Sequence, residues 1–187
     1  MAMGMQLKGM GVSDLNVESF TDAVKAVFDG STPALSPEEA QKVINDYLED
    51  LQKKATEAAQ AEAKSFLEAN AAKEGVKVTE SGLQYKVIKE GEGAQPKAED
   101  EVTVHYTGKL LNGTVFDSSV NRGEPATFPL NRVIPGWTEG VQLMKEGAKY
   151  EFFIPSDLAY GPQGIPNVIP PHSTLIFEVE LIKVNAK

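Results

Sequence analysis

The stretch VHYTGKLLNGTVFDSS, Val104–Ser119, places the dipeptide Asn112-Gly113 between two segments rich in β-branched and aromatic residues. Both residues of this dipeptide accept the positive φ of a type I′ turn, which makes Asn-Gly the strongest short signal for a β-hairpin. The sequence therefore predicts two antiparallel strands, at 101–110 and 114–116, joined by a tight turn.

Further strands are predicted on both sides of this hairpin, at 83–89, 149–154 and 175–184, because short apolar segments alternate there with turn residues. Between them, Trp137, Val141 and Met144 fall at helical spacing, which predicts one short helix against the sheet. The expected fold class is α+β.

The composition changes near Gly75, from helix-forming residues with almost no proline to strand-like segments punctuated by Gly and Pro. We therefore predict a domain boundary at this position. An all-helical domain is expected at 1–75. The second domain, at 76–187, has the size of one ordinary globular domain.

Two helices are expected in the helical domain. The first has Asn16 as its N-cap and Gly30 as its stop signal. The second begins with a capping box formed by Ser36 and Glu39. Since neither Gly nor Pro interrupts the chain after Pro37, at the first helical position, until Gly75, this helix should run for about 38 residues, on the order of 57 Å.

The helical domain carries more apolar side chains than elements of its size can bury alone. One interpretation is a helical hairpin that packs on the other domain of its own chain. The other, which we favour, is a homodimer, because the core of one copy is too small. The second half of the long helix, rich in Ala, Glu and Lys, would then be a solvated stalk. The apolar residues concerned are Met1, Met3, Met5, Met10, Phe20, Val24, Val27, Phe28, Val43, Ile44, Tyr47, Leu48 and Leu51.

Composition excludes several kinds of partner. With 41% hydrophobic and 24% charged residues, the 187-residue chain is typical of a soluble globular protein. No apolar run approaches the roughly 20 residues of a membrane-spanning helix. A net charge of −9 argues against nucleic acid or an anionic membrane as the main partner. No signal peptide is recognisable, so we expect a cytoplasmic chain as given, or a periplasmic or envelope protein if a signal peptide has been removed.

A search for chemistry finds no catalytic motif. His105 and His172 belong to no metal-ligand spacing, and no nucleotide-binding loop or paired-carboxylate spacing is recognisable. We therefore expect no metal and no cofactor. What stands out are aromatic and branched residues beside turn residues, which suit a core as well as an apolar pocket. They are Tyr106, Phe116, Phe128, Val133, Ile134, Trp137, Tyr160, Ile169 and Phe177.

Three blocks of the second domain resemble, in order and spacing, the FKBP-type peptidyl-prolyl cis-trans isomerase domain. They are 104–119, VIPGWTEGVQLMKEGAKYEFFIP at 133–155 and LAYGPQGIPNVIPPHSTLIFEVEL at 158–181, and the resemblance covers 76–187. Residues 1–75 are similar, more weakly, to the bacterial dimeric macrophage-infectivity-potentiator branch. The resemblance implies an antiparallel sheet wrapped on a short helix, preceded by a helical dimerisation domain with a long stalk helix, in a V-shaped homodimer.

The resemblance also implies a cofactor-free isomerase that acts on X–Pro bonds of unfolded or partly folded proteins and binds the macrolide inhibitors of the family. Departures from the family pattern at Ala126 and Ile165 bear on substrate preference. Two alternatives stay open, a non-catalytic binding module and a folding chaperone in which isomerisation is secondary. The implied catalytic residues are Asp117, Tyr160, Ile134 and Phe177, and the implied substrate-binding residues are Tyr106, Phe116, Phe128, Val133, Trp137, Ile169 and Arg122.

The same resemblance implies individual roles. Trp137 forms the floor of the pocket, the N–H of Ile134 and the hydroxyl of Tyr160 donate to substrate carbonyls, and Asp117, paired with Arg122, polarises the twisted amide.

The loop after Tyr160 is expected to be stiff, because prolines at positions 162, 166, 170 and 171 limit φ. Such a loop could hold Val168 and Ile169 over the pocket with little entropy left to lose on binding. An ordinary rigid connection is the alternative.

Overall fold

The computed structural model of the protein describes residues 1–9, 12, 15–32 and 34–185. The chain divides into two compact units, an N-terminal unit, Met1–Ala55, and a C-terminal unit, Thr56–Lys187. Among the described residues, none of the helices combines the length and apolar character that crossing a membrane requires.

The N-terminal unit consists of α1 (Ala2–Gly9), α2 (Val17–Asp29) and the first part of α3 (Pro37–Ala71). The expected cap of α2 is confirmed, because Asn16 Oδ1 accepts the N–H of Ser19 at 2.9 Å. Gly30 ends this helix in the left-handed conformation, with φ 73°. Helix α1 was not expected from the sequence.

The long helix α3 begins as expected. Ser36 N–H donates to Glu39 Oε2 at 2.9 Å, and Glu39 N–H donates to Ser36 Oγ at 3.3 Å, which confirms the capping box. The helix has 35 residues and ends at Ala71, slightly before the predicted end. Gly75, with φ 81°, then turns the chain toward the first strand.

Apolar side chains of the N-terminal unit remain exposed to solvent. Phe28 is 87% exposed and Val27 is 76% exposed, whereas Ala26 is buried. Met10, part of the predicted methionine cluster, lies outside the described residues. The other exposed apolar side chains of this unit include Met1, Met3, Met5, Val24, Val43, Ile44 and Tyr47.

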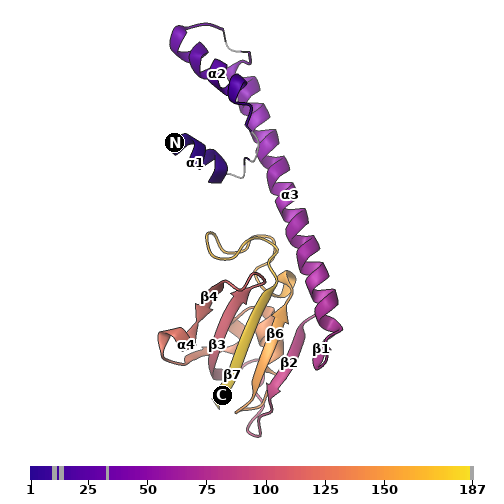
Figure 1. Cartoon of the computed structure of the whole chain (residues 1–187). Coiled ribbons are helices and arrows are strands. Elements are labelled where there is room, and N and C mark those ends of the chain that lie inside the picture. The colour runs from indigo at the N-terminus through magenta and orange to yellow at the C-terminus, as the bar shows by residue number, and fades with distance from the viewer. Residues whose placement is uncertain (10–11, 13–14, 33, 186–187) are drawn as a thin grey trace. The chain divides into compact units, whose positions relative to one another are not determined.

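The C-terminal unit contains a seven-stranded antiparallel sheet (Figure 1). Its strand order is β1-β2-β6-β7-β3-β4, and β5 pairs with β3. The predicted α+β class is confirmed. The strands β1 and β5 were not expected. The bounds are β1 Val76–Val78, β2 Gln84–Lys89, β3 Glu101–Leu110, β4 Val115–Ser118, β5 Ala126–Pro129, β6 Lys149–Ile154 and β7 Leu175–Asn185.

The hairpin between β3 and β4 forms, but its predicted type I′ turn is wrong. Only Gly113 has a positive φ, 85°, and Asn112 does not. The connection is longer than a two-residue turn, and Leu110 closes it by accepting the N–H of Gly113 and donating to the Thr114 carbonyl, both at 2.9 Å. Asn112 Oδ1 accepts the N–H of Thr114 at 2.9 Å, so its side chain stabilises the loop instead.

The core lies between the sheet and the short helix α5, Pro135–Val141, as expected. Trp137, Val141 and Met144 are buried in this core. Gly140 allows the close approach of helix and sheet, because a Cβ there would lie 2.7 Å from Phe152 Cε1. The remaining short elements are α4 (Ser119–Arg122) and the 3-10 turns η1 (Leu130–Arg132) and η2 (Ser156–Leu158).

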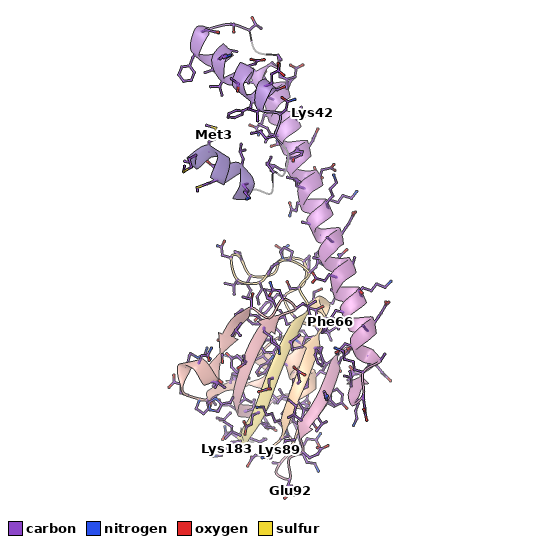
Figure 2. All side chains as sticks on the ribbon, in the orientation of Figure 1. Met3, Lys42, Phe66, Lys89, Glu92 and Lys183 are labelled. Carbon is purple, nitrogen blue, oxygen red and sulfur yellow. The ribbon has the colours of Figure 1, made fainter. Side chains whose placement is uncertain are left out.

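The last turns of α3 belong to the C-terminal unit because they pack on its sheet. Phe66, labelled in Figure 2, lies 6.0 Å from Phe153, centroid to centroid. The buried Asn70 donates to Gln84 Oε1 at 2.9 Å, and Gln84 donates to the Leu67 carbonyl at 2.8 Å. The unit therefore includes part of α3, whereas the domain boundary at residue 75 stays a prediction.

Candidate active site

The sheet and α5 enclose a pocket of about 140 Å³. Most of the residues expected at the site meet in it, although they come from separate parts of the chain. Its walls combine aromatic rings, two aliphatic side chains and one carboxylate. The lining residues are Tyr106, Phe116, Asp117, Phe128, Val133, Ile134, Trp137, Tyr160 and Phe177.

Trp137, which is only 4% exposed, is the centre of the aromatic cluster. Its ring meets Tyr106 at 5.2 Å and 88°, and Phe177 at 5.3 Å and 89°. Phe128 contacts it at 5.3 Å. Edge-to-face packing of this kind adds to the stabilisation from burial and fixes the orientation of each ring. The apolar surface of the pocket is thus formed before any ligand binds.

Gly108, on β3, makes room for two of these rings. A Cβ at this position would lie 2.6 Å from Phe177 Cε1 and 2.7 Å from Phe116 Cζ. Phe116 and Phe177 can therefore meet edge to face at 5.5 Å directly over the strand. Our sequence reasoning did not single out Gly108. Its position inside a predicted strand was the available signal, because such a glycine often marks a close approach.

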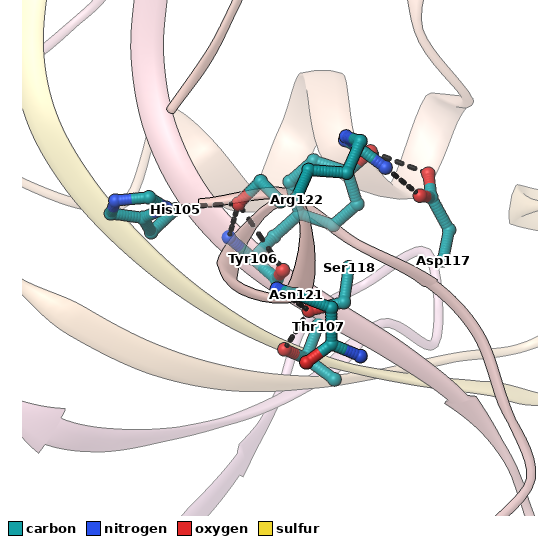
Figure 3. A network of polar contacts seen from close by, with 8 residues as sticks. His105, Tyr106, Thr107, Asp117, Ser118, Asn121 and Arg122 are labelled. Atoms are coloured by element: carbon teal, nitrogen blue, oxygen red, sulfur yellow. Dashed lines mark hydrogen bonds and ion pairs between the residues drawn. The ribbon is translucent and has the colours of Figure 1, made fainter. Parts of the chain in front are cut away.

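A polar network holds Asp117 at the edge of the pocket (Figure 3). Tyr106 Oη donates to Asp117 Oδ2 at 2.5 Å, and Arg122 Nη1 donates to Asp117 Oδ1. Arg122 Nη2 also donates to Tyr106 Oη at 3.0 Å. Both carboxylate oxygens are engaged, so the orientation of Asp117 is set by the protein. The expected pairing of Asp117 with Arg122 is present.

The network also shifts the ionisation of its members. Burial acts to raise the pKa of Asp117, but the hydrogen bonds from Tyr106 and Arg122 outweigh it and hold the pKa below its ordinary value. Burial, followed by the hydrogen bond to Asp117, raises the pKa of Tyr106. Burial, followed by the charge of Asp117, raises the pKa of Tyr160. At neutral pH the pocket therefore holds one carboxylate and two neutral phenols.

These shifts predict a flat pH profile of kcat/KM for a prolyl peptide between about pH 5.5 and 8. Because the pKa of Asp117 is lower in the folded protein than the unfolded value of about 3.9, its carboxylate stabilises the folded state above that pH. This stabilisation is lost only as the pH falls through the pKa of the folded protein, below the window. The raised tyrosine pKa values lie above the window. Rates measured across it should agree within about twofold, and a bell-shaped profile from folded protein would contradict the assignment.

Two predicted site residues do not line the pocket. Ile169 is only 2% exposed and belongs to the core of the C-terminal unit. Arg122 reaches the site through Asp117 and Tyr106. The substrate-binding roles predicted for these two residues stay predictions.

Backbone hydrogen bonds, as well as prolines, restrain the loop after Tyr160. Ile165 N–H donates to the Ile169 carbonyl at 2.8 Å, and Ile169 N–H donates back to Ile165 at 2.9 Å. Gly164 must be glycine, because its φ is 59° and a Cβ would lie 2.2 Å from the Ile169 carbonyl oxygen. Val168, 46% exposed, lines a separate depression of about 340 Å³ beside Leu110.

The histidines contact polar side chains. His105 Nδ1 lies 3.0 Å from Ser119 Oγ, and His172 Nδ1 lies 3.3 Å from Gln60 Nε2. Within the part of the chain that the structure describes, no three His, Cys, Asp or Glu side chains are grouped as a metal site would need.

Known proteins similar to this chain agree with the fold. Residues 92–182 match the model of the FKBP-type peptidyl-prolyl cis-trans isomerases, and residues 1–87 match that of the domain amino terminal to them. A probable FKBP-type isomerase FkpA of Neisseria meningitidis is 51% identical over 188 residues, covering 97% of this chain and 69% of the relative.

Two further similarities concern Escherichia coli. Its FKBP-type 22 kDa peptidyl-prolyl cis-trans isomerase is 48% identical over 185 residues, covering 97% of this chain and 90% of the relative. The crystal structure of its FkpA matches with a TM-score of 0.82 at 36% identity, covering 97% of this chain and 87% of that one. The expected resemblance is confirmed on both units, and the chain belongs to the family of FKBP-type peptidyl-prolyl cis-trans isomerases.

Proposed function

We propose that the chain accelerates cis-trans isomerisation of X–Pro bonds in unfolded or partly folded proteins by binding the bond in the pocket above Trp137, without a covalent intermediate. The observation that carries this proposal is a preformed aromatic pocket with one carboxylate fixed at its edge. Such a site suits a reaction that breaks no bond.

Rotation about an amide is slow because resonance gives the C–N bond double-bond character, with a barrier of about 18–20 kcal/mol. For X–Pro bonds the cis and trans forms are nearly balanced, yet they interchange over roughly tens to hundreds of seconds. A catalyst needs only to stabilise the twisted state. A thousandfold acceleration requires about 4 kcal/mol, which a few well-placed contacts can supply.

The rings of the pocket favour the twisted state by replacing water. A planar amide is more charge-separated than a twisted one, so it is better solvated by water. Moving the amide from water onto the apolar surface formed by Phe116, Trp137 and Phe177 therefore lowers the energy of the twisted amide relative to the planar one. Because these rings already pack edge to face, little reorganisation accompanies binding.

Asp117 supplies the electrostatic part of the proposed mechanism. When the amide twists, its carbonyl carbon loses electron density from nitrogen and becomes more positive. A carboxylate already oriented by Tyr106 and Arg122 attracts this developing charge without first rearranging. Its lowered pKa keeps it charged at neutral pH.

Two donors complete the proposed site. Tyr160 lines the pocket with a hydroxyl that its raised pKa keeps protonated. Ile134 is the N-cap residue of α5 and also lines the pocket. Its carbonyl accepts from Trp137 at 2.9 Å. We assign its N–H, together with the Tyr160 hydroxyl, to the carbonyls on either side of the X–Pro bond.

Replacing Phe177 by leucine tests this assignment. We expect kcat/KM for a chromogenic prolyl peptide, measured by coupled proteolysis of the trans form, to fall about tenfold, because the ring is one wall of the pocket and leucine covers less of the amide. The matched control is Phe153→Leu, a buried phenylalanine of the same sheet that packs on Phe66 instead. Wild-type activity in a folded Phe177→Leu protein would show that the pocket has been assigned wrongly.

We further propose that the chain works as a homodimer joined through its N-terminal unit. The support is the set of exposed apolar side chains on α2 and on the first half of α3, including Val27, Phe28 and Ile44. Exposed groups of this kind in a small helical unit are typical of an interface with a second copy.

The same exposed side chains favour a second candidate function, the holding of unfolded chains with isomerisation secondary. Suppression of aggregation by an Asp117→Ala variant separates the two. A variant that loses isomerase activity but suppresses aggregation as the wild type does would support a holding activity that is independent of the pocket.

A further inference from the structure

Ser119 fills a gap in the sheet next to the pocket. Strand β3 pairs with β5 up to Val104 and with β4 from Thr107 onward, so positions 105 and 106 have no strand partner on that side. The side chain of Ser119 takes the place of that partner. Tyr106 N–H donates to Ser119 Oγ at 2.8 Å, and Ser119 Oγ lies 3.4 Å from the Tyr106 carbonyl.

The contact between Ser119 and Tyr106 is buried, and His105 also contacts the Ser119 hydroxyl. Ser119 is 0% exposed, so water does not compete for the hydrogen bond between its hydroxyl and the Tyr106 N–H. His105 Nδ1 lies 3.0 Å from the same oxygen (Figure 3). The Ser119 hydroxyl, which can both donate and accept, therefore meets three polar groups, the N–H and the carbonyl of Tyr106 and Nδ1 of His105. The position of Ser119 Oγ is therefore defined on three sides.

The helical turn α4 contacts Tyr106 at two points, its backbone and its hydroxyl. Ser119, its first residue, bonds the backbone of Tyr106. Arg122, its last residue, donates to the Tyr106 hydroxyl at 3.0 Å and to Asp117. The Tyr106 hydroxyl in turn donates to Asp117 at 2.5 Å. A shift of the backbone at Tyr106 would therefore move the hydroxyl that orients the carboxylate.

We propose that Ser119 is a positioning residue for the isomerase reaction, which holds Tyr106, and through it Asp117, in the orientation that stabilises the twisted amide, with His105 supporting it. This inference rests on the role proposed above for Asp117. Ser119 does not line the pocket and acts only through its neighbours.

The test begins with Ser119→Ala in the full chain, measured on a prolyl peptide. We expect kcat to fall about fivefold and KM to change less than about twofold, because a buried hydrogen bond is lost while the apolar surface that binds the peptide remains. Thr107→Val is the matched control. It removes a hydroxyl of the same strand that bonds Ser118 at 2.9 Å rather than Ser119, and it should leave kcat unchanged.

A double-mutant cycle separates positioning from general support of the fold. In an Asp117→Ala background, Ser119→Ala should reduce kcat by less than about twofold, because the group it positions is absent. An undiminished fivefold loss in that background would overturn the proposal. So would a wild-type kcat for Ser119→Ala when Asp117→Ala alone is slow. If Asp117→Ala is itself as fast as the wild type, the result contradicts the role proposed above for the carboxylate.

A second pair of variants keeps the test valid if Ser119→Ala does not fold. His105→Leu removes the contact with Ser119, whereas His105→Asn places an amide near the position of Nδ1. We expect His105→Leu to lower kcat about twofold to threefold and His105→Asn to restore it. Equal activity of the two variants, both at the wild-type level, would contradict the supporting role of His105 and with it the proposed chain of contacts.

Discussion

Replacing Asp117 by alanine is expected to lower kcat/KM for a prolyl peptide about ten- to a hundredfold while the protein stays folded. The side chain is 41% exposed, so its loss removes little buried surface. What is lost is the fixed negative charge that we propose to act beside the bond that rotates. Charge-assisted contacts in a partly dry site are worth more than neutral ones, and the expected size of the effect follows from this.

Two further variants identify the property of Asp117 that matters. Asp117→Asn keeps the size of the side chain but removes its charge, and it should be nearly as slow as Asp117→Ala. Asp157→Ala is the control, because it removes an exposed carboxylate of the same unit from η2 and should leave the rate unchanged. If Asp117→Asn turned over as fast as the wild type, the charge would have no part in the reaction.

A chain shortened to begin at Thr56 is expected to be monomeric, to keep most of its activity on a short peptide, and to lose at least about tenfold in catalysis of proline-limited refolding of a protein. The pocket lies wholly within the C-terminal unit, and a prolyl peptide needs nothing else. An unfolded protein can contact both pockets of a dimer, and the first contact raises the effective concentration for the second.

The starting residue of this shortened chain matters. Beginning at Val76 instead would remove Asn70, which bonds the buried Gln84, and Phe66, which packs on Phe153. Light scattering checks the oligomeric state, and matched peptide and refolding assays check the two activities. Equal losses on both substrates would show that the helices support the catalytic fold. A monomeric full-length chain would exclude the two-pocket explanation.

Much of the fold was predictable because local signals agree with the tertiary structure. The capping box of Ser36 and Glu39 and the strands on either side of Gly113 are short-range features, and both are present. The strands β1 and β5 were missed because three or four residues are too few to show an alternating pattern, and β5 also ends in Pro129. The turn type was wrong because it depends on the exact ends of the strands.

The pocket was predicted better than the groups that support it. Large aromatic residues such as Trp137 are easily noticed in a sequence, and the resemblance to a family assigns these residues to one pocket. Gly108 and Ser119 act through contacts with rings and backbone that the fold brings together, and the position of Gly108 inside a predicted strand was the one signal that the sequence offered for this pair. Ile169 was assigned to the pocket by the resemblance. In the structure it is buried in the core and is not among the lining residues, so its substrate-binding role stays a prediction.

The central claim is that this pocket lowers the barrier to X–Pro rotation without covalent chemistry. Exchange spectroscopy by NMR on a prolyl peptide, with a catalytic amount of the full chain, measures that rotation directly and needs no coupled protease. We expect cis-trans exchange to accelerate in proportion to the concentration of the chain, and to return to the uncatalysed rate when a macrolide inhibitor of the family fills the pocket. Exchange at the uncatalysed rate in the presence of the folded chain, or acceleration that the inhibitor does not abolish, would contradict the account.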